Sequence, residues 1–153
     1  KEMEKMGIII DVSHLSDEGF YDVAKHTEKP FIASHSNCRA VCSFPRNLTD
    51  DELRIIGERK GIAGINLCED FLSDSGRAGK DDIFRHIDHM LGICGEDCIC
   101  LGCDFDGIPA TPQGVEDVSK IGQMLDDIAD EFGKTTAEKI AKGNFMRIIG
   151  ELL

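Results

Sequence analysis

The stretch Ile8-Ile-Ile-Asp-Val-Ser-His14 decides the fold, because an apolar run there leads directly into a polar turn. Three later runs have the same character, so the four expected strands lie near residues 7–14, 30–35, 61–66 and 98–104. Each run is short, rich in β-branched or small residues, and bounded by glycine or proline. These features are typical of parallel strands that are buried on both faces.

The stretches between the runs carry apolar residues at helical spacing. Capping boxes at Thr49–Glu52 and Thr135–Glu138 predict where two of the helices begin. Strands that alternate with helices imply a parallel sheet with right-handed crossovers. We therefore expect one domain over residues 1–153, with four βα units and an extra C-terminal helix. Two architectures fit: the C-terminal half of a (β/α)₈ barrel, which typically needs ~250 residues, or an open four-stranded parallel sheet.

Composition argues against several classes of partner. The net charge of −12 repels phosphate backbones and anionic lipid, so we expect no nucleic-acid partner and no membrane partner. No apolar run approaches the ~20 residues of a membrane span. The 7 cysteines are odd in number and lie mostly within apolar runs, where cysteine acts as a small hydrophobe. This usage indicates a reducing compartment, and we expect a cytoplasmic protein.

Three of the expected strands end in a residue that can bind a metal or transfer a proton: His14, His35 and Asp104. In both architectures the functional edge lies at the C-terminal ends of the strands. Neutral imidazoles bind zinc, and a nearby carboxylate can take the proton of a metal-bound water. Arg46 follows the second strand, and a guanidinium there can hold a substrate carboxylate. Singly, these residues are equally typical of a hydrogen-bonded loop, a turn or a surface; together they favour a metal-hydrolase site.

The motifs that carry these residues resemble those of the membrane (renal) dipeptidase family in order and in spacing. They are Ile10-Asp-Val-Ser-His14, Ile32-Ala-Ser-His-Ser36, Pro45-Arg-Asn-Leu48 and Gly102-Cys-Asp-Phe-Asp-Gly107. The resemblance implies a (β/α)₈-barrel peptidase that hydrolyses dipeptides with two zinc ions. It further implies that His14 and His35 bind one zinc, that Asp104 is the acid–base residue, and that Arg46 holds the dipeptide's C-terminal carboxylate.

Half of the family's metal site has no counterpart in this sequence. The resemblance implies a second zinc, held by a His-x-Asp on the first strand of the family's complete barrel and by a glutamate that bridges both metals. Neither of the strands that carry these ligands is present in this sequence. The one His-x-Asp here, His86-Ile-Asp88, falls in a predicted helix, where positions i and i+2 lie ~200° apart, so it is a false match. We therefore expect at most one partial Zn²⁺ site and negligible peptidase activity for this chain alone. The expected partners are a dipeptide substrate and either the missing N-terminal half-barrel or a second copy of the chain.

Other interpretations stay open, and one is a full-length relative with different amidohydrolase chemistry, since fold does not fix substrate. The chain is also consistent with a non-catalytic half-barrel that self-associates, because an open parallel sheet exposes two edges. Cys38-x₃-Cys42 and Cys100-x₂-Cys103 superficially resemble zinc-ribbon ligands. The second pair lies at the end of a buried strand, however, where residues three apart face opposite sides. The other histidines, His26, His86 and His89, are predicted to be structural or surface residues.

Overall fold

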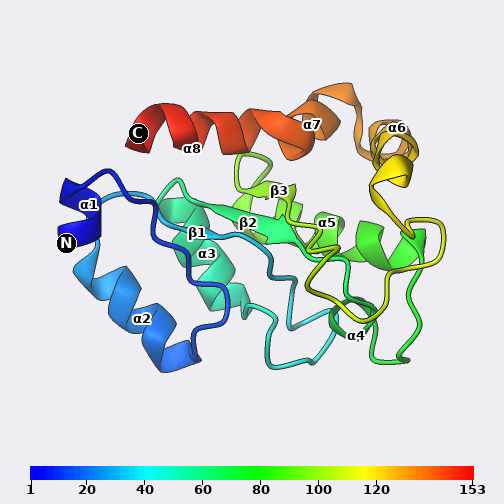
Figure 1. Cartoon of the computed structure of the whole chain (residues 1–153), viewed down its shortest axis with the longest axis horizontal. Helices are drawn as coiled ribbons and strands as arrows, with labels where there is room; N and C mark the ends of the chain where they lie inside the picture. Colours follow the sequence, from blue (N-terminus) through cyan, green and yellow to red (C-terminus); the bar gives the residue numbers. More distant parts are fainter.

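Three short parallel strands form the centre of the molecule (Figure 1). The computed structural model describes all residues, 1–153. The strands are β1 (Ile32–Ala33), β2 (Ile62–Ile65) and β3 (Ile99–Leu101), hydrogen-bonded in the order β1-β2-β3. Ile32 lies opposite Ile62, and Ala63 lies opposite Ile99. Three of the four expected strands therefore form, each shorter than its apolar run, and they do not close into a barrel.

The expected first strand, near residues 7–14, is reduced to a single parallel bridge between Asp11 and Ile32. Ile32 donates its N–H to the Ile10 carbonyl, and the Val12 N–H bonds back to the Ile32 carbonyl. Beyond this point side chains replace the backbone ladder, because the N–H of Ser34 bonds to the carboxylate of Asp11. The prediction of a full strand near residues 7–14 is therefore wrong, although this segment does lie beside β1.

Helices connect and follow the strands. In chain order they are α1 (Glu2–Lys5), α2 (Asp17–His26), α3 (Asp50–Glu58), α4 (Glu69–Leu72), α5 (Lys80–Cys94), the 3₁₀ helix η1 (Val118–Lys120), α6 (Ile121–Phe132), α7 (Lys134–Glu138), the π-helical turn η2 (Lys139–Gly143) and α8 (Asn144–Leu152). The capping box at Thr49 begins α3 as predicted. The predicted box at Thr135 is wrong: α7 begins one residue after Gly133, whose φ of 90° ends α6, so Thr135 already lies inside the helix.

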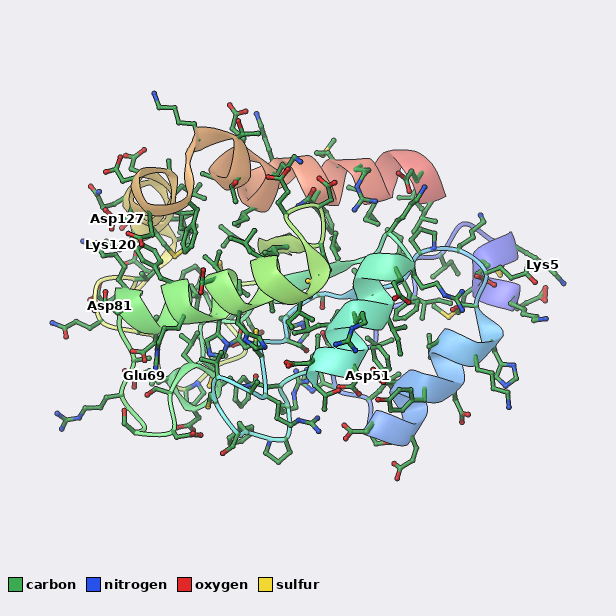
Figure 2. The ribbon with its side chains drawn as sticks, turned by 180° about the vertical axis from the view of Figure 1, so that it is seen from behind. Lys5, Asp51, Glu69, Asp81, Lys120 and Asp127 are labelled. Atoms are coloured by element: carbon green, nitrogen blue, oxygen red, sulfur yellow. The ribbon has the colours of Figure 1, made fainter.

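Helices α3 and α5 cover one face of the sheet and lie side by side there (Figure 2). Because strand side chains alternate between faces, the row Ala33, Ala63 and Ile99 points toward these helices. It joins the larger apolar core, to which α3 contributes Leu53 and Ile56 and α5 contributes Ile83, Ile87 and Met90. All but Ala33 and Ala63 of this set are large aliphatic side chains, and burying each stabilises the fold by roughly 1.5–3 kcal/mol.

Helix α8 packs against the other set of strand residues, along the upper side of the sheet in Figure 1. Ile148 and Leu152 form a smaller apolar cluster with Ile32, Ile62 and Cys100. Arg147 of the same helix donates hydrogen bonds to the backbone carbonyls of Lys60 and Asp97, just before β2 and β3. The helix therefore crosses the N-terminal ends of these strands and leaves their C-terminal ends free. None of the helices combines the length and the apolar character that crossing a membrane requires.

Candidate metal centre

The imidazoles of His14 and His35 meet at the C-terminal end of the sheet. Their Nε2 atoms lie 2.9 Å apart, and the ring centroids lie 4.9 Å apart. His14 follows the segment that bridges to β1, and His35 follows β1 itself. Two residues that are 21 positions apart in sequence thus direct the same ring nitrogen toward one point in space.

The backbone around this pair is held in unusual conformations. Three residues other than glycine have a positive φ, and two of them, His14 (75°) and Asp104 (60°), are expected site residues. Such conformations cost on the order of 1–3 kcal/mol each and persist where the surrounding structure imposes them. The backbone beside His35 also lies very close to the sheet, since a Cβ at Gly64 or Gly102 would lie 2.1 Å or 1.9 Å from the Ser34 carbonyl oxygen. Only glycine there lets the segment of His35 approach β2 and β3.

Asp104, at the end of β3, is oriented by a buried amide. Asn66 donates from Nδ2 to Oδ2 of Asp104 at 3.1 Å. Asn66 is itself fixed, because its N–H bonds to Oδ1 of Asn37 and its Oδ1 accepts from the N–H of Cys68. Both asparagines are fully buried. Sequence reasoning missed them; the available signal was an asparagine directly after the third apolar run.

Burial and neighbouring charges shift the pKa values of two side chains at this edge, His35 and Arg46. Burial lowers the pKa of His35, and the negative charge of Asp104 partly offsets that effect. Burial likewise lowers the pKa of Arg46, against the opposing effects of Asp104 and Asp11. The structure thus gathers His14, His35, Asp104 and Arg46 in one region, with only the two histidines and the Asn66–Asp104 pair in direct hydrogen-bond contact.

Arg46 has an unused hydrogen-bond donor. Its Nη2 is buried and has no hydrogen-bond partner in the chain. Its guanidinium carbon lies 5.7 Å from the centre of the Phe71 ring, within range of a cation–π contact. A buried guanidinium nitrogen without a partner is costly, so this atom is available to bind a carboxylate or a water.

The histidine pair fits part of a metal site. Two imidazole nitrogens this close can both reach one zinc ion at ~2.0–2.1 Å. The chain has no cluster of three or more histidine, cysteine, aspartate or glutamate side chains that could hold a metal. Catalytic zinc usually takes three protein ligands. The donors present therefore fit one side of a zinc coordination shell and leave the rest to be supplied.

The remaining histidines and the cysteines have structural positions. His86 of α5 is fully buried and bonded on both ring nitrogens, to the Cys38 N–H and to the Leu72 carbonyl. His89 bonds across to Asp50 of α3. All seven cysteines are free, and five of them are buried. The pair His86-Ile-Asp88 indeed lies within α5, as the helical spacing predicted.

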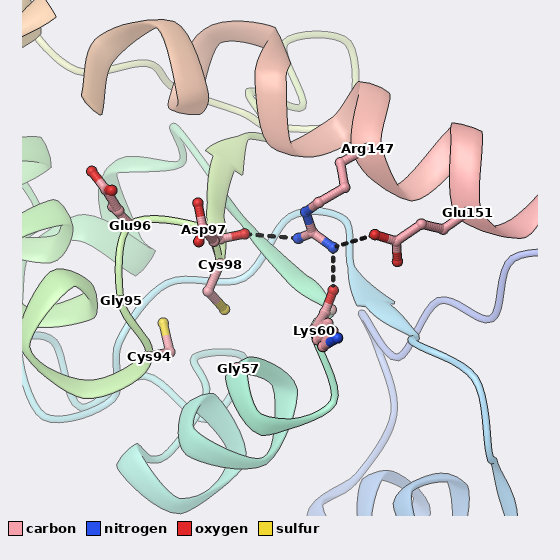
Figure 3. A pocket seen from close by; sticks show the side chains of 10 residues that line it. Gly57, Lys60, Cys94, Gly95, Glu96, Asp97, Cys98, Arg147 and Glu151 are labelled. Carbon is pink, nitrogen blue, oxygen red and sulfur yellow. Dashed lines mark hydrogen bonds and ion pairs between the residues drawn. The ribbon is translucent and has the colours of Figure 1, made fainter. Parts of the chain in front are cut away.

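A sizeable cavity lies away from this centre. It has a volume of about 550 Å³ and lies beside the loop between α5 and β3, where Arg147 reaches over from α8 (Figure 3). Its lining includes Lys60 and Asp97, which precede β2 and β3, so the cavity opens at the N-terminal ends of the strands. Parallel α/β proteins place their chemistry at the opposite end, and we assign the candidate site there on chemical grounds rather than by cavity size.

Comparison with known proteins places this chain within one family of hydrolases. Residues 1–152 match the membrane dipeptidase family (peptidase family M19). The chain belongs to that family, whose members are metallodipeptidases. It is 37% identical over 97% of its length to an uncharacterized protein in the pqqA 5′ region of Klebsiella pneumoniae. It is 34% identical over 99% of its length to the dipeptidase aclJ of Aspergillus oryzae.

Solved structures agree with the sequence comparison. A metallopeptidase from Rhodobacter sphaeroides, liganded with a phosphinate mimic of the dipeptide L-Ala-D-Ala, superimposes on 99% of this chain with a TM-score of 0.94 and 34% identity. The match covers 44% of that structure, 56% of the Klebsiella protein and 36% of the Aspergillus dipeptidase. The chain thus spans between about a third and just over half of the length of these relatives.

Proposed function

We propose that this chain supplies one half of a zinc dipeptidase active site, as the C-terminal half of a (β/α)₈ barrel. The observation that carries the proposal is the 2.9 Å approach of the His14 and His35 Nε2 atoms at the C-terminal end of the sheet. Membership of the metallodipeptidase family supports it, as does the dipeptide mimic bound by the Rhodobacter relative. The substrate class is therefore dipeptides, cleaved at the peptide bond by water.

Each residue at this edge has a role in the proposal. His14 and His35 would hold one zinc ion, which would supply a nucleophilic water of lowered pKa. Asp104, held by Asn66, would be the acid–base residue, with its carboxylate accepting a proton and donating it to the departing amine. The free Nη2 of Arg46 binds the dipeptide's terminal carboxylate, which satisfies an otherwise unpartnered buried donor.

The 153 residues alone fall short of a working site. Two imidazoles are one ligand fewer than catalytic zinc usually takes, and the chain offers no third donor beside them. We therefore expect weak zinc binding and a negligible dipeptidase rate from the isolated chain. The remaining ligands have to come from a complementary half-barrel that covers the open side of the sheet.

A hybrid protein tests this proposal. The part of the Rhodobacter metallopeptidase that this chain does not match is joined to residues 1–153, and hydrolysis of L-Ala-D-Ala is measured with zinc. We expect activity in the hybrid, a loss of at least ~10²-fold in kcat for Asp104→Asn, and a raised KM with little change in kcat for Arg46→Met. An active hybrid in which Asp104→Asn is as fast as the parent contradicts the assignment. So does a robust rate from the isolated chain.

A second candidate function is a non-catalytic half-barrel that associates with itself. The outer edge of β3 pairs with no strand, and the edge segment near Asp11 makes only one bridge. Ile8 and Leu15 of that segment are 46% and 45% exposed, although both are large and apolar. Unpaired edges and exposed apolar side chains favour association.

A further inference from the structure

A chain of hydrogen bonds leads from the carboxylate of Asp11 to the ring of His35. Oδ2 of Asp11 lies 2.5 Å from the hydroxyl oxygen of Ser34, and that oxygen lies 2.6 Å from Nδ1 of His35. The other carboxylate oxygen, Oδ1, accepts the backbone N–H groups of Ser13 and Ser34, each at 3.0 Å. None of the roles proposed above uses Asp11 or Ser34.

The hydrogens available along this series of hydrogen bonds determine which ring nitrogen of His35 is protonated. All partners of the Asp11 carboxylate are donors, as an ionised carboxylate requires. The Ser34 hydroxyl has a single hydrogen, which it donates to Asp11, so toward His35 it can only accept. Nδ1 of His35 must therefore carry a hydrogen, and in the neutral ring the lone pair is then on Nε2.

That lone pair is directed at the second histidine. Nε2 of His35 faces Nε2 of His14 at 2.9 Å, a distance at which two lone pairs would repel. In the metal-free chain, His14 Nε2 therefore carries a proton and donates it to His35. Binding of a divalent cation between them requires only that this proton move from Nε2 to Nδ1 of His14, since His35 is already the tautomer that can bind.

We infer that Asp11 and Ser34 are positioning residues that fix His35 as the Nδ1–H tautomer and so direct its Nε2 lone pair to the metal position shared with His14. This inference rests on the proposed function and deepens it, since it adds the residues that prepare one ligand. The hydroxyl of Ser13 assists by accepting the backbone N–H of His35 at 3.1 Å. Outer residues of this kind commonly contribute 10–100-fold to metal affinity.

Asp11→Asn separates this role from a general structural one. The Asn side-chain oxygen keeps the two backbone N–H bonds, so the loop stays folded. Its amide, however, donates to Ser34 instead of accepting from it. The Ser34 hydroxyl must then donate to Nδ1, which moves the ring proton of His35 to Nε2 and blocks the metal position. Ser34→Ala removes the hydroxyl that connects Asp11 to His35. Ser34→Thr keeps a hydroxyl at this position and so keeps the connection.

The measurement is nitrogen-15 NMR of the histidine rings in the isolated, metal-free chain at neutral pH. We expect a protonated Nδ1 and an unprotonated Nε2 for His35 in the parent and in Ser34→Thr. We expect the reverse in Asp11→Asn and a mixture of tautomers in Ser34→Ala. The exposed residues Asp22 and Ser119 provide controls, since Asp22→Asn and Ser119→Ala leave His35 unchanged. An Nε2–H tautomer in the parent, or an unchanged tautomer in Asp11→Asn, overturns the inference.

Titration with Zn²⁺ separates this inference from the proposed function. We expect Asp11→Asn to weaken zinc binding 10–100-fold relative to the parent and to Asp22→Asn. If the parent and His35→Ala bind zinc equally, the proposed function fails, and the tautomer result alone decides the inference. If the parent binds zinc through His35 and Asp11→Asn binds as tightly, the inference fails while the proposed function stands.

Discussion

At the scale of single residues, His86 shows how a buried ring serves the fold instead of the site. Its Nδ1 accepts the N–H of Cys38, and its Nε2 lies 3.1 Å from the Leu72 carbonyl, so the neutral ring satisfies both partners. Burial lowers the pKa of His86 to about 4, although the bond to Leu72 opposes the shift. The ring thereby links α5 to the segment that follows β1 and to the last residue of α4.

This depressed pKa predicts acid sensitivity. In the unfolded chain the ring takes up a proton near pH 6.5, and in the folded chain only near pH 4, so the unfolded state binds more protons between these values. The free energy of unfolding should therefore fall as pH falls from 6.5 to 4, by on the order of 3 kcal/mol from this group. Urea unfolding at several pH values measures it. His86→Asn keeps an acceptor for Cys38 and should flatten this part of the profile, whereas the exposed-site control His26→Asn should not.

Some of the site residues could be predicted from the sequence, and others could not. His14, His35 and Asp104 each follow an apolar run, and parallel strands bring such ends together, so their convergence could be predicted. Their metal-binding and acid–base roles stay predictions. Asn66 and Ser34 could not be singled out, because their importance depends on hydrogen bonds between segments 20 to 40 residues apart. A serine or asparagine at a strand end is too common to indicate such a bond by itself.

At the scale of elements, one arginine attaches α8 to the segments before two strands. Arg147 donates from Nη1 to the Lys60 carbonyl at 2.7 Å and from Nη2 to the Asp97 carbonyl at 2.8 Å, and it pairs with Glu151 (Figure 3). The two carbonyls stand just before β2 and β3. One side chain therefore holds α8 to the N-terminal ends of both strands.

Replacing that arginine should loosen the helix. We expect Arg147→Met to lower the free energy of unfolding by roughly 2 to 4 kcal/mol, because two charge-assisted bonds are lost and two carbonyls lose their partners. Hydrogen exchange should speed up in residues 144–152 more than in α3 or α5. Lys142→Met, an exposed change in the turn before α8, is the control. Equal exchange rates in the two variants would contradict the role given to Arg147.

The elements themselves were predictable where local signals were strong. The capping box at Thr49 and the apolar stripe of α5 gave helices that the structure confirms. The short pairing of the first segment could not be predicted. Its length depends on whether a backbone carbonyl or a side chain accepts the N–H of Ser34, and here the Asp11 carboxylate accepts it. The capping pattern predicted that the helix would begin after Thr135, but α7 begins at Lys134. Gly133 is both the C-cap of α6 and the N-cap of α7, so Thr135 already lies inside the helix.

At the scale of the whole molecule, charge opposes the association that the open sheet favours. The net charge of −12 makes two copies repel, and acidic side chains such as Asp51 and Asp81, labelled in Figure 2, are exposed. Salt screens this repulsion. It does not remove the stabilisation that two copies gain by burying exposed apolar side chains such as Ile8 and Leu15. We expect sedimentation velocity to show more dimer or larger species at 0.5 M salt than at 0.05 M. A single monomeric species at both salt concentrations would count against self-association.

The proposed function requires that His14 and His35 together bind one zinc ion. X-ray absorption at the zinc edge, recorded on the zinc-loaded chain and on His14→Ala and His35→Ala, measures this coordination. We expect two imidazole ligands in the parent, and in each variant the loss of one imidazole together with weaker binding. Zinc coordinated by cysteine sulfur, or a spectrum that neither substitution changes, would contradict it.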